Sequence, residues 1–331
     1  MKRLVLAIFV AAALISGCNR IEIEGDDAKQ IKFGAASTRA EVTSANDILA
    51  FKVFAEMNLG ADNAEDGSDK QWISLLENER VYRDNSDADF TYDNTRYWVN
   101  DRAFYFFGFY PETINVMRYG LENGWAYTST IEVPYAADLD FMTAIYSQGI
   151  TDNAFPESVP MQFVHRFARV KFNIKKAENN KEDKFTVTEI GFSGISRSAT
   201  FALMYRQGQP YEPILTPKSE NGTVSRRNLN KTIEAAGTDL LGNNGLLLLP
   251  QTIVAGQAAL NISFQYQQKE DTDGTAIENQ TLSKALPEVI WEANKTYVYN
   301  LELKDDKNIY ISTPTVEGWG TSQPGGFIIV Q

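Results

Sequence analysis

Apolar residues occupy every second position in several short segments of this chain, and this spacing constrains its fold more than any other feature. Val170, Phe172 and Ile174 alternate with polar residues, and the same alternation runs through residues 297–303. Successive side chains of a β-strand point to opposite faces, so such segments predict sheets with one buried and one wet face. We therefore predict an all-β protein.

The predicted strands are short runs rich in aromatic and β-branched residues, separated by Gly, Pro, Asn and Asp. Two runs, 104–107 and 246–249, are apolar at consecutive positions, which predicts strands covered on both faces. Polar stretches at 58–70, 84–89 and 269–274 predict loops. The predicted strands are 48–55, 103–110, 141–147, 169–175, 185–192, 199–205, 245–249, 259–267, 296–303, 309–312 and 326–330.

The N-terminus has the layout of a bacterial lipoprotein signal. A basic start at residues 1–3 precedes an apolar run over 4–15, and the sole cysteine, Cys18, follows two small residues. The run is too short for a permanent membrane span but suits the apolar part of a cleaved signal peptide. We expect removal of residues 1–17 and acylation of Cys18, by palmitate among other chains, which would hold the body at a membrane.

Composition argues against catalysis, metal binding and nucleic-acid binding. The formal charge is −12, and loss of Lys2 and Arg3 with the signal makes it −14, which repels nucleic acid. One cysteine and one histidine cannot supply a disulfide or a three-ligand zinc site. His165 lies in a predicted strand and is interpreted as structural. We expect no enzyme, no cofactor and no metal.

Acidic clusters leave calcium as an open alternative, because carboxylate oxygens are ligands that calcium prefers. None of the clusters has the spacing of the twelve-residue calcium loop, so solvated surface charge is the preferred interpretation. The clusters are Asp84, Asp87, Asp89 and Asp93; Asp62, Glu65, Asp66 and Asp69; and Asp271 with Asp273.

Length and motif order indicate more about organisation. After the signal the chain is about twice the usual domain length, and prolines at 156 and 160 mark a candidate joint between two domains.

Further motifs, in chain order, are Ile31-Lys32-Phe33, Ser37-Thr38-Arg39-Ala40, residues 160–170, residues 247–252, residues 291–299 and Val316-Glu317-Gly318-Trp319-Gly320. Together with the lipoprotein signal, this order resembles the fimbrillin-like lipoproteins, which build proteinase-assembled (type V) pili in anaerobic Gram-negative bacteria. The resemblance spans essentially the whole chain.

This resemblance implies two β-sandwich domains of transthyretin-like type, an N-terminal one over 40–158 and a C-terminal one over 159–331. It also implies that an arginine-specific protease cuts between Arg39 and Ala40 and releases residues 18–39. Ile31 and Phe33 have strand spacing, so loss of this segment would bare an apolar groove that a strand from another subunit could fill. In the family the donor is C-terminal, which here implies Phe327, Ile328, Ile329 and Val330.

The function implied is that of a structural or tip subunit of a surface fimbria at the outer membrane, with a role in adhesion and other fimbrial subunits as partners. The alternative is a lipid-anchored binding module for glycan or host protein that does not polymerise. Aromatic residues stack on sugar rings, so an exposed aromatic cluster would favour the alternative. The candidates for such a cluster are Trp72, Tyr97, Trp98, Trp125 and Tyr127.

Overall fold

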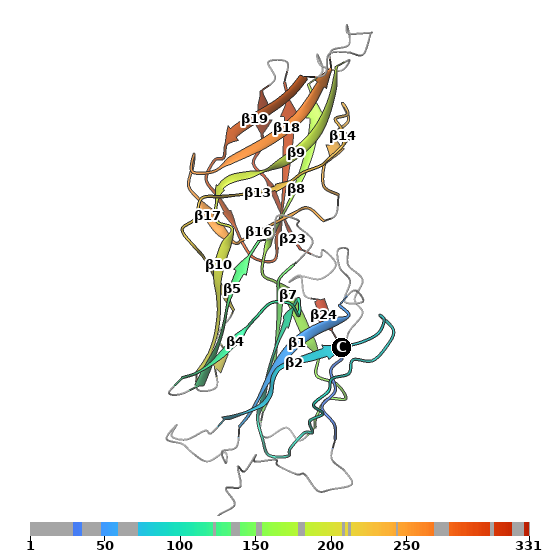
Figure 1. The fold of residues 1–331 in the computed structure, drawn as a ribbon, viewed down its shortest axis with the longest axis vertical. Helices are drawn as coiled ribbons and strands as arrows, with labels where there is room; N and C mark the ends of the chain where they lie inside the picture. Colours follow the sequence, from blue (N-terminus) through green and yellow to red (C-terminus); the bar gives the residue numbers. More distant parts are fainter. Residues whose placement is uncertain are drawn as a thin grey trace, which may run out of the picture.

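Every regular element in the described part of the chain is a strand, which confirms the all-β prediction. The computed structural model describes residues 29–34, 48–58, 72–121, 124–133, 140–149, 154–177, 183–206, 209–210, 213–242, 244–267, 278–304, 308–319 and 328–330. The strands form an elongated body of a lower and an upper lobe (Figure 1). Each lobe contains two sheets, as expected for β-sandwiches.

The lower lobe contains the first and second sheets. The strand order of the first sheet is β2 (Trp72–Tyr82), β1 (Ala50–Asn58), β3 (Phe104–Tyr110), β6 (Met142–Gln148), β7 (Met161–His165) and β24 (Ile328–Val330). The second sheet has the order β11 (Gln209–Pro210), β10 (Ser198–Arg206), β5 (Gly124–Glu132) and β4 (Met117–Leu121), with β12 (Ile214–Pro217) also paired to β10.

The upper lobe contains the third and fourth sheets. The third has the order β13 (Gly222–Arg226), β9 (Lys184–Ile195), β18 (Ala259–Gln267) and β19 (Glu278–Ala285), with β14 (Lys231–Thr232) on β9. The fourth has the order β15 (Thr238–Asp239), β8 (Ala168–Lys176), β21 (Lys295–Leu303) and β22 (Ile309–Ile311), with β16 (Leu246–Leu248) on β8 and β23 (Thr315–Gly318) on β21. A ribbon of β17 (Gln251–Ile253) and β20 (Val289–Trp291) accompanies them.

Burial follows the sequence patterns. In β8 the side chains of Val170, Phe172 and Ile174 are buried while Asn173 and Lys175 are exposed, so the predicted alternation is confirmed. Strand β3 is buried from Phe104 to Phe109 and lies inside the first sheet, as its unbroken apolar run predicts. The three leucines of β16 are also buried.

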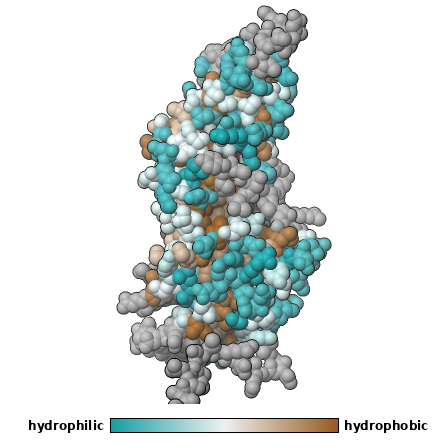
Figure 2. All heavy atoms as spheres, viewed as in Figure 1, coloured by the Kyte–Doolittle hydropathy of each residue, from teal (hydrophilic) through white to brown (hydrophobic). Residues whose placement is uncertain are grey.

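Two apolar cores fill the body. The larger core lies between the first and second sheets, where Phe54 and Phe107 contact Tyr127, and it continues into the upper lobe through residues such as Phe172. The smaller core lies on the other face of the first sheet. The first sheet is therefore covered on both faces. On the face seen in Figure 2, the described surface is mainly hydrophilic, with apolar residues in small groups.

The second sheet combines strands from both sides of the predicted joint. Strand β10 pairs along its whole length with β5, from Ser198↔Glu132 to Arg206↔Gly124. Strand β7 likewise pairs with β6 of the first sheet. Residues beyond 158 thus contribute to both sheets of the lower lobe, and the division at 158/159 stays a prediction.

Candidate functional site

The segment at residues 29–34 lies over the smaller core of the lower lobe. Ile31 is 0% exposed and Phe33 is 3% exposed, whereas Lys32 between them is exposed. The segment therefore has the in-and-out pattern of a strand.

Two loops hold the backbone of this segment, one on each side. On one side the Ile31 N–H donates to the carbonyl of Arg96 at 2.8 Å, and the Trp98 N–H donates to the carbonyl of Lys29 at 2.9 Å. On the other side the Val159 N–H donates to the carbonyl of Lys32 at 2.7 Å. The segment bridges two loops above the first sheet and is not a member of that sheet.

Aromatic contacts account for the burial of Phe33. Its ring meets those of Phe51, Tyr92 and Phe106 edge to face, with centroids 6.1, 5.5 and 6.0 Å apart. The Tyr92 O–H also donates to the carbonyl of Ile31 at 2.8 Å. Burial raises the pKa of Tyr92, so this hydroxyl keeps its proton. Removing the segment would uncover this apolar surface. Burying one side chain of this size stabilises the folded protein by about 1.5–3 kcal/mol.

The C-terminal strand lies beside the same part of the chain. β24 pairs antiparallel with β7, with Ile328 opposite Phe163 and Val330 opposite Met161 (Figure 1). Val159, which bonds the N-terminal segment, is separated from the start of β7 by one residue, Pro160. One stretch of chain, residues 159–163, therefore contacts both the N-terminal segment and the C-terminal strand.

The structure locates part of the predicted processing and exchange site. Ile31 and Phe33 are buried as described above, and Ile328, Ile329 and Val330 form β24. Cys18, Arg39, Ala40 and Phe327 lie outside the described residues. Lipidation, processing and strand donation therefore stay predictions.

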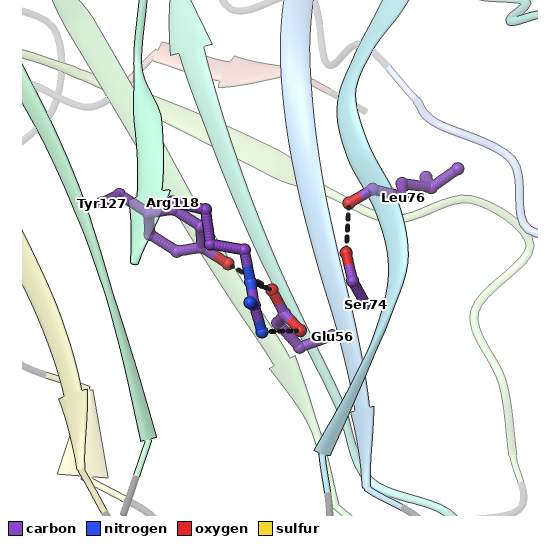
Figure 3. A network of polar contacts seen from close by, with 5 residues as sticks. All are labelled: Glu56, Ser74, Leu76, Arg118 and Tyr127. Carbon is purple, nitrogen blue, oxygen red and sulfur yellow. Dashed lines mark hydrogen bonds and ion pairs between the residues drawn. The ribbon is translucent and has the colours of Figure 1, made fainter. Parts of the chain in front are cut away.

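A buried charged network joins the two sheets of the lower lobe, and sequence reasoning did not predict it. Glu56 of β1 is 0% exposed and accepts two hydrogen bonds from the Arg118 guanidinium, at 2.5 and 2.9 Å (Figure 3). The Tyr127 O–H donates to the same carboxylate at 3.0 Å. Burial raises the pKa of Glu56, although the bonds to Arg118 act to lower it. The network is a structural link between strands, because each polar group in it has a partner.

His165 has a structural environment, as its place in a strand predicted. The side chain is buried, and Nδ1 contacts the carboxylate of Asp140. The ring lies face to face with the indole of Trp319. Asp140 is 25 residues away in sequence, so spacing could not reveal this partner.

The aromatic residues considered for sugar stacking do not form an exposed cluster. Trp98, Trp125 and Tyr127 are buried in the cores, and Trp72 packs against Trp125. Tyr97 is 41% exposed. These five residues therefore do not form the exposed aromatic cluster that would favour a glycan-binding face.

The described ranges contain neither a metal site nor a membrane-spanning helix. No group of three or more His, Cys, Asp or Glu side chains there is arranged to hold a metal ion. The cluster of Asp84, Asp87, Asp89 and Asp93 is among those residues, whereas residues 62–69 and 271–273 are outside them. No described helix is long and apolar enough to cross a membrane.

Similarity to other proteins agrees with the fold. Residues 38–319 match the family described as fimbrillin-like. The chain belongs to the fimbrillin-like family. Fimbrillins are structural proteins of fimbriae, so the family to which this chain belongs is not a family of enzymes. No curated protein is significantly similar to the chain.

Two solved structures of fimbrial proteins are similar to this fimbrillin-like chain over most of their length, and the first of them shares its fold. A fimbrial protein from Bacteroides vulgatus is 18% identical, with 88% of this chain and 99% of that chain covered and a TM-score of 0.61. The tip fimbrial protein Mfa3 from Porphyromonas gingivalis is 11% identical, with 88% and 98% covered and a TM-score of 0.29.

Proposed function

We propose that this fimbrillin-like chain is a subunit of a surface fimbria that takes part in adhesion. It is exported as a lipoprotein acylated at Cys18 and carried to the outer membrane. An arginine-specific protease then cuts after Arg39, and subunits assemble by strand exchange. Membership of the fimbrillin-like family supports the fimbrial role.

One observation supports the exchange step. The segment that cleavage would release and the strand that would be donated both contact residues 159–163. Release of the segment would open the groove around Phe51 and Phe106 and free the N–H of Val159. An incoming strand could restore both the main-chain hydrogen bonds and the alternate apolar contacts.

The mature N-terminus tests this proposal. We would determine the intact mass and N-terminal sequence of the protein on the outer surface of its native cell. A start at Ala40, with the lipid on Cys18 gone, is the expected result. A surface pool that begins at acylated Cys18 would overturn processing and leave a lipid-held binding module.

A matched pair of variants separates cleavage from folding. Arg39→Ala should keep residues 18–39 and yield no polymer, whereas Arg20→Ala removes another arginine of the same segment and should assemble normally. Polymers formed by the Arg39→Ala protein would contradict strand exchange through this groove.

A further inference from the structure

Strand β7 has β6 on one edge and β24 on the other (Figure 1). The Arg166 N–H, just beyond β7, donates to the carbonyl of Phe141 at 2.8 Å. Alternate residues of an extended strand direct their main-chain groups to the same side, so Arg166 and the even-numbered residues of β7 face β6. Met161 and Phe163 therefore direct theirs to the other edge, where the register pairs them with β24.

The segment at residues 29–34 bonds the same stretch of main chain just before β24 does. The Val159 N–H donates to the carbonyl of Lys32 at 2.7 Å, and the Gly34 N–H donates to the carbonyl of Val159 at 3.2 Å. The chain bends immediately upstream, at residues 157–158. An extended strand that replaces the segment at Val159 can thus continue its pairing only along residues 161–163, which β24 covers.

One apolar core joins the two positions. The rings of Phe163 and Phe51 meet edge to face with centroids 5.2 Å apart, and Phe51 meets Phe33 in the same way at 6.1 Å. Met161 and Phe163 are both 0% exposed. The groove under Phe33 and the edge of β7 are therefore two parts of a single acceptor surface.

Strand β24 is a small part of its sheet. It has three residues, whereas β2 at the opposite edge of the same sheet has eleven. Main-chain hydrogen bonds provide most of the affinity of an added strand, so a short strand is the more easily displaced. Loss of β24 would leave the pairing of β7 with β6 intact.

We propose that β24 is an autoinhibitory cap: paired with β7 of its own subunit, it closes part of the acceptor surface that an incoming strand needs. This inference rests on the proposed function, because it takes residues 159–163 as that surface. Removal of residues 18–39 then opens only the part at Val159. The rest opens when β24 leaves, so a subunit that has donated its strand becomes a better acceptor, and donation and acceptance are coupled.

The test is the binding of a synthetic peptide of residues 325–331, labelled at its N-terminus, to the processed protein purified from cells that express the full chain. Ile328→Pro removes the N–H that faces Phe163 and should release the cap. Fluorescence anisotropy should show at least about tenfold tighter binding to this variant than to the wild type, because the apparent affinity falls with the fraction of molecules whose edge is open. Equal affinity for the two proteins would overturn the proposal.

Modified peptides show whether the probe binds as a strand. A methyl group on the nitrogen of Ile328 removes a main-chain donor that faces β7 and should abolish binding. A methyl group on the nitrogen of Ile329 lies on the alternate position, which faces away, and should leave binding unchanged. Equal binding of both methylated peptides would contradict pairing along this edge.

Two further proteins keep the test decisive. A chain that ends at Gly326 lacks the cap altogether and should bind the peptide as tightly as Ile328→Pro does, and thermal unfolding of both checks that the fold persists. Uncut Arg39→Ala protein, with and without Ile328→Pro, should show the same direction of change, since β24 covers residues 161–163 before processing as well. The cap is thus tested even if the mature protein begins at Cys18, so the two proposals can fail separately.

Discussion

The indole of Trp319 lies flat on the imidazole of His165, with ring centroids 4.0 Å apart and planes 4° from parallel. The guanidinium of Arg169 lies 5.0 Å from the centroid of the same indole. The backbone N–H of Trp319 also donates to the carbonyl of Asn294 at 3.3 Å. Trp319 follows β23 directly, so these contacts fix the point from which the chain continues towards β24.

Truncation of Trp319 should therefore be costly. We expect Trp319→Ala to lower the free energy of unfolding by about 3–5 kcal/mol, the range for deleting a buried aromatic side chain. Trp319→Phe keeps a ring against His165 and should cost less. Urea unfolding of the three proteins measures the difference, and equal losses for both variants would contradict a role for the stacked ring.

Phe33 should stabilise the protein only while its segment is attached. In the uncut chain, Phe33→Ala should lower the free energy of unfolding by about 3–5 kcal/mol, because it empties a site lined by three aromatic rings. Lys32→Ala, on the exposed side of the same segment, should change it little. After cleavage at Arg39 the Phe33→Ala and Lys32→Ala proteins should become equally stable, because the segment that differs between them is gone. A persistent difference would show that the segment stays bound.

The pairing of β24 with β7 can be trapped covalently. Gln162 and Ile329 are paired in the register of the two strands. The Cα atoms of directly paired residues in antiparallel strands lie about 4.5–5.5 Å apart, which is within the range of a disulfide. A protein carrying Gln162→Cys and Ile329→Cys should form this bond in the free subunit and lose the capacity to polymerise until reduced. Non-reducing mass analysis and electron microscopy provide the readouts. Each single variant serves as a control, and polymerisation of the oxidised double variant would contradict donation by β24.

Glu56 should make stability depend on pH. Burial raises the pKa of Glu56 above its usual 4.5, despite the opposing bonds from Arg118. The folded state thus binds this proton more readily than the unfolded chain, so the stabilisation is full below 4.5 and is lost as pH rises through the folded value. Glu56→Gln should remove that pH dependence. Glu317→Gln, on the exposed strand β23, should retain it when unfolding is measured across the same pH range.

Close strand packing makes Gly191 sensitive to added volume. A Cβ atom there would lie 2.3 Å from the carbonyl oxygen of Val224 and 2.4 Å from the Cα of Ser225, both on β13. Gly191→Ala should therefore cost at least about 1–3 kcal/mol, as overpacking does. Gly120→Ala on β4 meets nothing within 4 Å and should be nearly neutral. Urea midpoints of the two variants compare them directly.

Sequence patterns predicted those strands in which apolar residues alternate regularly with polar ones or form an unbroken run. The run at 259–267 coincides with β18, and the run at 103–110 differs from β3 by one residue. By contrast, β2 was not predicted. Its burial alternates irregularly, since its pairing with β1 shifts register twice. Strand β19 was not predicted either, because it is exposed and polar along most of its length and so lacks an apolar pattern.

The candidate site was only partly accessible to sequence reasoning. The spacing of Ile31 and Phe33 was enough to predict a buried strand-like segment. Its partners Arg96 and Val159 could not be predicted, because they lie in loops about 65 and 125 residues further along the chain. The run predicted for β1 ended before Glu56, and nothing local links that carboxylate to Arg118, 62 residues away. Polar partners of this kind become visible only when the sheets are assembled.

The route of the chain has a mechanical consequence. The chain builds β1–β7 in the lower lobe, passes to the upper lobe for β8 and β9, and returns to the lower lobe for β10–β12. It then completes the upper lobe and comes back once more as β24. A pulling force on either lobe must therefore shear strands that are covalently continuous with the other lobe. We expect the two lobes to resist tension as a single mechanical unit and not to separate as independent domains.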